Sequence, residues 1–140
     1  MFTSLLPDDD LYRVYVDAYA ERYYIKRFAK DYRGKTWLVT LESIKDDLRR
    51  VRALEKTQQA DELKHKDSLW IFKYDFAIAK SGVSPKRSGN RCVVLLNADT
   101  HRIDILMVYG KGDLPKNQNE TVYILGVVER EFPAFWTRFD

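Results

Sequence analysis

Residues 92–109, CVVLLNADTHRIDILMVY, carry the pattern that decides the fold. The run 92–96 is continuously apolar, which is typical of a central strand buried on both faces. NADTH supplies a hairpin connection, and residues 102–109 return as a partner strand. This stretch therefore predicts two neighbouring antiparallel strands in the middle of a sheet.

A third strand precedes them at residues 69–79, LWIFKYDFAIA. Large apolar side chains alternate there, from Trp70 to Ile78, and Lys73 and Asp75 lie on the opposite face. The segment 80–91 that follows is rich in Gly and Ser and reads as a turn. Three successive strands predict an antiparallel meander.

The N-terminal half reads as a strand followed by two helices. Residues 11–20 alternate with period two, and residues 21–32 change to helical spacing before Gly34. Thr40 suits the N-cap of a second helix that we expect to run to about Glu55. Residues 57–67 have no sustained apolar face and predict a loop. The fold class is therefore α+β.

The C-terminal part leaves one alternative open. Residues 120–132, ETVYILGVVEREF, have the composition of a strand, but Asn119 suits a helix N-cap and Pro133 suits a helix end. Residues 133–140 contain three aromatic side chains, and we expect this tail to pack on the body or on a partner.

Length and composition set the class of protein. The chain has 140 residues, one Cys, two His, 45% apolar and 14% aromatic residues, which predicts a single domain over 1–140 with an N-terminal extension at 1–10. Lone Cys92 excludes a disulfide scaffold, and no Cys/His cluster indicates a metal site. No signal peptide or run of about 18 apolar residues is present, so we expect a cytoplasmic protein without a membrane role.

The net charge of +3 conceals a polarised distribution. Residues 22–35 contain six basic residues and one acid, and residues 80–91 contain four basic residues and no acid. A solvated helix face or hairpin loop explains each stretch, and phosphate binding is the functional alternative. The candidate RNA-binding residues are Lys26, Arg27, Lys30, Lys80, Lys86 and Arg87.

Three short motifs follow one another at plausible spacing: IFKYDF at 71–76, Gly89-Asn90-Arg91 before CVVLL, and ILMVYGKGDLP at 105–115. In this order they resemble the RelE/ParE toxin superfamily, whose element order the chain shares from about residue 11 to residue 132. The resemblance implies a RelE-like toxin of a toxin–antitoxin pair, with an antitoxin protein as partner and mRNA on the ribosome as a possible substrate.

That resemblance also implies cleavage of RNA without a metal or other cofactor, by Lys, Arg and Tyr side chains. Attack by the 2′-OH needs one proton removed, another delivered and charge on phosphate stabilised. Carried across, Arg91 is a phosphate clamp, and Lys73 and Lys111 are basic residues beside it. Tyr109 or Tyr123 would stack on a base or transfer a proton.

The chain departs from the family pattern at two places. Asp75 stands where active ribonucleases carry a second basic residue, and Gly112 and Asp113 stand where a C-terminal Arg is expected. A carboxylate beside a cleavage site repels phosphate unless it serves as a base or pairs with Lys73. The alternative function is a non-catalytic binding protein, or a ParE-like inhibitor that acts through protein contacts. A nucleic-acid-binding protein unrelated to toxins is a third interpretation.

Overall fold

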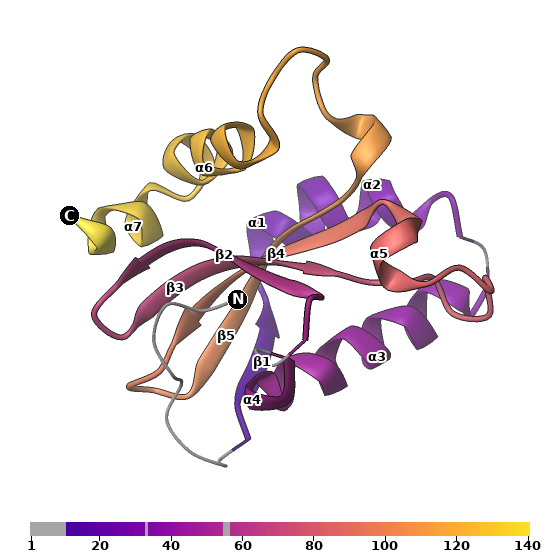
Figure 1. Ribbon diagram of the computed structural model, residues 1–140, viewed down its shortest axis with the longest axis horizontal. Helices are drawn as coiled ribbons and strands as arrows, with labels where there is room; N and C mark the ends of the chain where they lie inside the picture. Colours follow the sequence, from indigo (N-terminus) through magenta and orange to yellow (C-terminus); the bar gives the residue numbers. More distant parts are fainter. Residues whose placement is uncertain (1–10, 33, 55–56) are drawn as a thin grey trace.

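The computed structural model describes residues 11–32, 34–54 and 57–140. The extension at 1–10, Arg33 of the first basic stretch and the expected helix end near Glu55 lie outside the described residues. Figure 1 shows a twisted sheet with helices on both faces. The sheet has five strands in the order β1-β5-β4-β3-β2.

The strands are β1 (Arg13–Val16), β2 (Ala60–Lys66), β3 (Leu69–Asp75), β4 (Asn90–Asn97) and β5 (Arg102–Gly110). From β2 to β5, each strand pairs antiparallel with the next one along the chain, and β1 pairs parallel with β5. The sheet is therefore mixed, and the α+β class is confirmed. The predicted meander gains a fourth strand, because residues 57–67 are not a loop. Strand β2 escaped prediction because it is an edge strand whose side chains are mostly half-buried or exposed, and it needs no apolar face.

The first helix begins earlier than predicted. Asp17 caps it, since its carboxylate accepts hydrogen bonds from the backbone N–H groups of Tyr19 and Ala20. The helix continues through α1 (Ala18–Ala20), a π-helical turn η1 (Glu21–Ile25) and α2 (Lys26–Ala29). This cap ends β1 at Val16, well before the predicted limit at residue 20.

The second helix, α3 (Thr36–Arg49), is followed by α4 (Val51–Leu54). Thr40 is not its N-cap but lies inside the helix, buried. Its hydroxyl donates to Thr36 O at 2.8 Å and accepts from Ala79 N at 2.9 Å. The Thr40 hydroxyl, which we expected to cap the helix, therefore binds the backbone just beyond β3 instead.

The open alternative at 120–132 is resolved as a helix, α6 (Glu120–Glu131). The Asn119 side chain accepts from Val122 N at 3.1 Å, as an N-cap does. Ile124, Val127 and Val128 are buried, at the spacing of one helical face. The helix forms because this face has a sheet to cover.

The tail packs on the body of the protein. It forms α7 (Pro133–Trp136) and η3 (Thr137–Phe139), and Phe139 is buried. The Lys64 ammonium on β2 lies 4.5 Å from the ring centroid of Trp136, which is a cation–π contact. Two short elements complete the fold: α5 (Pro85–Ser88) and η2 (Lys111–Asp113).

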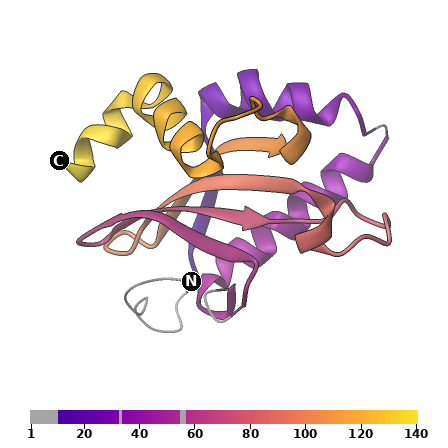
Figure 2. The same cartoon turned by 45° about the horizontal axis from the view of Figure 1, so that its top comes forward.

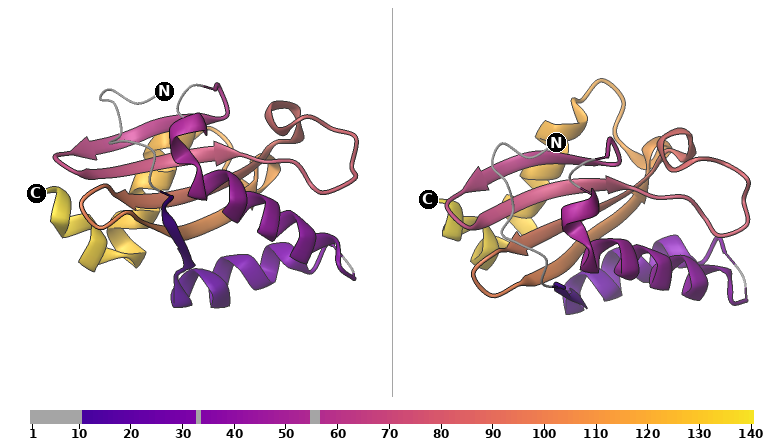
Figure 3. Two further views of the ribbon diagram at one scale, coloured as in Figure 1. Left: turned by 90° about the horizontal axis from the view of Figure 1, so that it is seen from below. Right: turned by 60° about the horizontal axis from the view of Figure 1, so that its bottom comes forward.

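The sheet separates two apolar clusters. Figures 2 and 3 show α3 on one face and α6 with α7 on the other. Cys92, Val94 and Leu96 of β4 join the cluster with α3, and Val93 and Leu95 join the cluster with α6. This confirms β4 as a central strand buried on both faces. Within the described residues, no helix combines the length and apolar composition needed to cross a membrane.

Candidate functional site

Five polar side chains from β3, β4, β5 and α6 meet at one end of the face that α6 covers. We call them the central polar cluster: Lys73, Asp75, Arg91, Tyr109 and Glu120. Strand register brings the first four together, because Asp75 pairs with Arg91 across β3 and β4, and Arg91 pairs with Tyr109 across β4 and β5. Glu120 enters from the first turn of α6.

Arg91 and Asp75 form a buried ion pair, with 3.0 Å between Nε and Oδ1 and side chains only 10% and 7% exposed. Among residues 11–32, 34–54 and 57–140, no N–H points at Asp75 Oδ1 with hydrogen-bond geometry, so its contact with Arg91 is electrostatic. Burial raises the pKa of Asp75, against the opposing charges of Arg91 and Lys73. Arg91 Nη1 also donates to Asn90 O at 3.0 Å.

Glu120 joins the other two members. Its Oε1 accepts from Lys73 Nζ at 3.0 Å, and its Oε2 accepts from the Tyr109 hydroxyl at 2.8 Å. Burial acts to raise the pKa of Glu120, but these two hydrogen bonds and the charge of Lys73 outweigh it, and the pKa is lowered. The pKa of Tyr109 is raised by burial and by donation to Glu120.

The cluster therefore contains two cations and two carboxylates, and its charges cancel. Of the two roles expected for Asp75, pairing with Lys73 is wrong: Lys73 pairs with Glu120, and Asp75 pairs with Arg91. Sequence reasoning missed Glu120, whose signal was its place directly after the N-cap Asn119 on the helix that faces the sheet. Arg91 and Lys73 each pair with one of these carboxylates, which suits a role in positioning Tyr109.

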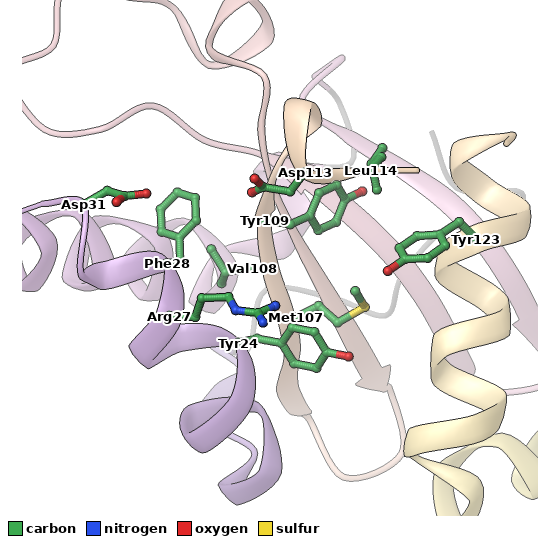
Figure 4. A pocket seen from close by; sticks show the side chains of 10 residues that line it. All are labelled: Tyr24, Arg27, Phe28, Asp31, Met107, Val108, Tyr109, Asp113, Leu114 and Tyr123. Carbon is green, nitrogen blue, oxygen red and sulfur yellow. The ribbon is translucent and has the colours of Figure 1, made fainter. Parts of the chain in front are cut away.

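A cleft of about 350 Å³ adjoins the cluster, between α2, β5 and α6. Figure 4 shows Arg27 and Tyr24 on one side and Tyr123 on the other, pointing toward one another over Met107. The lining residues are Tyr24, Arg27, Phe28, Asp31, Met107, Val108, Tyr109, Asp113, Leu114 and Tyr123.

Two of the three tyrosine hydroxyls in this cleft are engaged. Tyr24 donates to Glu131 Oε1 at 2.6 Å, and Tyr109 donates to Glu120. Within the described residues, the Tyr123 hydroxyl has no hydrogen-bond partner. Tyr123 is therefore the tyrosine of the cleft that can donate a proton to a ligand.

The charged residues of the cleft are Arg27, Asp31 and Asp113. Asp113 Oδ2 accepts from Gly110 N at 2.9 Å, which holds this carboxylate at the start of η2. One cation, two carboxylates and a phenol are thus present in one cleft. They can bind a phosphate oxygen, accept a proton and donate a proton.

The other predicted cations are exposed at the end of the sheet where β3 and β5 end and β4 begins, and we call them the basic end: Lys80, Lys86, Arg87 and Lys111. Gly89 has a φ of 76°, and its carbonyl accepts from Lys111 N at 2.6 Å, so α5 and η2 are adjacent. Lys86 Nζ donates to Gln58 Oε1 at 3.3 Å. On α2, Arg27 lines the cleft, while Lys26 and Lys30 are exposed outside its lining.

Comparisons with known proteins give one structural similarity. No family model matches the chain, and no curated protein gives a significant match. A chain of the crystal structure of the archaeal RelE–RelB complex from Pyrococcus horikoshii OT3 superposes with a TM-score of 0.49 and 14% sequence identity. The similarity covers 74% of the present chain and 99% of the other.

Proposed function

We propose that this protein is a RelE-like toxin that cleaves single-stranded RNA in the cleft between α2 and α6, without a metal. The observation that carries the proposal is the presence of Arg27, Asp113 and Tyr123 in one cleft. These residues lie far apart in the sequence and come from α2, η2 and α6. An antitoxin partner and the mRNA on the ribosome as substrate are part of this proposal.

The chemistry assigns one role to each of the three groups. The Asp113 carboxylate accepts the proton of the 2′-OH, and the 2′ oxygen attacks the adjacent phosphorus. Arg27 stabilises the charge that develops on the phosphate oxygens. The Tyr123 hydroxyl donates its proton to the departing 5′ oxygen. The products are a 2′,3′-cyclic phosphate and a 5′-hydroxyl end, and water returns the proton from Asp113 to Tyr123.

The surroundings of the cleft support RNA as the ligand. The half-buried ring of Tyr123 offers a stacking surface for an unpaired base, whereas the ring of Tyr109 is buried. Lys111 belongs to the same short helix η2 as Asp113 of the cleft, and it can contact the phosphate of a neighbouring nucleotide. Lys80 and Lys86 lie at the same end of the sheet and extend the basic surface for a longer RNA. Arg91 and Lys73 act as positioning residues through Tyr109 and Glu120.

The test is cleavage of a single-stranded RNA by the purified protein with excess chelator. Asp113→Asn is the decisive variant, because an amide oxygen still accepts from Gly110 N but cannot take the proton. We expect cleavage to fall about 10²-fold or more in Asp113→Asn and in Arg27→Ala. Arg50→Ala, which removes an exposed arginine of the α3 C-terminus, is the matched control and keeps full activity.

A second candidate function has its own observation. Two of the three cations that the family pattern assigns to cleavage, Arg91 and Lys73, are neutralised by carboxylates. A protein that binds RNA or inhibits another enzyme without cutting has no need of free cations there. RNA binding without any cyclic-phosphate product from the wild-type protein would replace the first proposal with this one.

A further inference from the structure

A second pocket lies at the opposite end of the sheet, where β4 and β5 meet their hairpin. It has a volume of about 300 Å³ and includes three arginines, Arg13, Arg102 and Arg138, with one carboxylate, Asp104. Figure 3 shows the C-terminal helix α7 and the β4–β5 hairpin at the same end of the molecule. We call this the strand-end pocket.

The strand-end pocket is separate from the cleft. Arg102 and Tyr109 both belong to β5, seven residues apart, which corresponds to about 23 Å along a strand at about 3.3 Å per residue. Helices α6 and α7 cover the apolar residues between them. One small ligand therefore cannot occupy both.

The single carboxylate of the pocket is already compensated. Arg102 donates to Asp104 through Nε and Nη2, at 3.0 to 3.2 Å, and its guanidinium lies 4.1 Å from the ring centroid of Tyr15. Asp104 itself is buried, at 7% exposure. This bidentate pair forms a neutral, fixed wall.

Two arginines remain for a ligand. Arg13 Nη2 donates to Thr100 O at 3.1 Å, and among the residues that the structure describes, its Nε and Nη1 donors have no partner. Within the described residues, Arg138 has no hydrogen-bond or ion-pair partner. Asn97 uses its Oδ1 to cap the hairpin turn at Asp99 N and Thr100 N, which leaves its NH₂ group as a further donor.

We infer that the strand-end pocket binds a phosphate group. With Arg102 and Asp104 paired, the lining keeps a charge of +2 from Arg13 and Arg138. Guanidinium forks match the oxygens of a phosphate in a bidentate geometry, and a dianion neutralises this charge. The half-buried Phe135 supplies an apolar side against which the organic part of a phosphate ester can lie. The phosphate is carried by a free nucleotide or by the 5′ end of an RNA.

The experiment is a titration of the full-length protein followed by two-dimensional NMR, with inorganic phosphate as the first probe and acetate as the anion control. We expect saturable shifts of the Asn97 and Thr100 amides and of the Arg13 Nε resonance with phosphate and not with acetate. Equal response to acetate, or no saturable shift, overturns the inference.

The variants separate this pocket from the basic end. Arg13→Gln combined with Arg138→Gln should weaken the phosphate response at least tenfold, and glutamine at position 13 retains a donor for Thr100 O. Arg138→Gln alone replaces an exposed side chain, so it should weaken phosphate binding without any change in the denaturant midpoint of unfolding. Arg87→Ala at the basic end should leave it intact. If Arg87→Ala loses the phosphate response and the double variant keeps it, phosphate binds at the basic end and the inference is wrong.

Two further arms distinguish the sources. Tighter binding of adenosine monophosphate than of inorganic phosphate assigns the pocket to a free nucleotide. Tighter binding of a 5′-phosphorylated oligoribonucleotide than of its 5′-hydroxyl form assigns it to an RNA end. Neither arm depends on RNA cleavage, so failure of the proposed function leaves this inference standing, and the reverse also holds.

Discussion

Arg91 on β4 and Asp75 on β3 face each other across the two central strands, with 3.0 Å between Nε and Oδ1 and both side chains buried. This pair lies beside Tyr109, the residue opposite Arg91 on β5, which lines the cleft. Removing one member leaves an uncompensated charge in the interior, whereas removing both does not.

Arg91→Met should lower the free energy of unfolding by about 3–5 kcal/mol, because Asp75 is then buried without its cation. Urea denaturation at pH 7 measures the change. The double variant Arg91→Met with Asp75→Leu should recover much of the loss. If the losses of unfolding free energy in the two single variants simply add in the double variant, the two residues do not pair directly.

Glu120→Gln should destabilise the protein by about 1.5 kcal/mol at pH 7, the scale of hydrogen bonds to a charged acceptor. The folded pKa of Glu120 lies below its ordinary value of 4.5, so its contribution is complete above that value. As the pH falls through the lower folded pKa, the difference between wild type and variant should disappear. A difference that stays constant between pH 7 and pH 2.5 would show that ionisation is not its source.

Asp75→Asn should show the opposite trend with pH. The folded pKa of Asp75 is raised, so its ionised form is disfavoured in the folded protein. The wild type should gain stability relative to Asp75→Asn as the pH falls through the raised folded pKa toward the ordinary value of 3.8. Urea unfolding across this range measures both variants, and parallel profiles for the two would be inconsistent with the opposite shifts.

Tyr123→Ala should weaken binding of a single-stranded RNA by about 5- to 100-fold, because base stacking on an aromatic side chain contributes about 1–3 kcal/mol. Tyr123→Phe should keep the affinity and lose cleavage, since it retains the ring but not the hydroxyl. Fluorescence anisotropy with a labelled oligomer measures binding. Val122→Ala, at an exposed position of the same helix, is the control, and an equal loss there would argue against the cleft.

The double variant Lys86→Ala with Arg87→Ala should reduce the slope of log K against log salt by about 1.4, since each contact to a single-strand phosphate contributes about 0.7. Lys45→Ala with Arg50→Ala removes two cations of α3 and should leave the slope unchanged. Identical slopes in all three proteins would remove the basic end from the RNA-binding surface.

Much of the sheet could be predicted because β3, β4 and β5 bury long apolar runs, and such runs are visible in the sequence. Strand β2 could not, because at the sheet edge its side chains need no apolar face. The predicted N-cap at Thr40 was wrong for a related reason. Its hydroxyl suits a cap, but it accepts from Ala79 N, which is distant in sequence. The helix α6 depended on the sheet face that its apolar residues cover.

For the candidate site, the family resemblance pointed to Lys73, Arg91, Lys111, Tyr109 and Tyr123. Strand register places Lys73, Arg91 and Tyr109 together on one face. Their engagement by Asp75 and Glu120 could not be predicted, because Glu120 arrives on a helix whose docking follows from packing. Arg27 was predicted as a general RNA-binding residue, and its separation from Lys26 and Lys30 depends on which helix face meets the cleft.

By itself the sequence determined an α+β chain with central strands, a tyrosine-rich composition and basic residues concentrated at 22–35 and 80–91, since these follow from periodicity and counts. Only the tertiary structure decided which charges remain available to a ligand. Ion pairing depends on the distance between side chains, which the fold sets. Carboxylates neutralise Arg91, Lys73 and Arg102. Among the described residues, Arg27, Arg13 and Arg138 have no carboxylate partner and can bind a ligand.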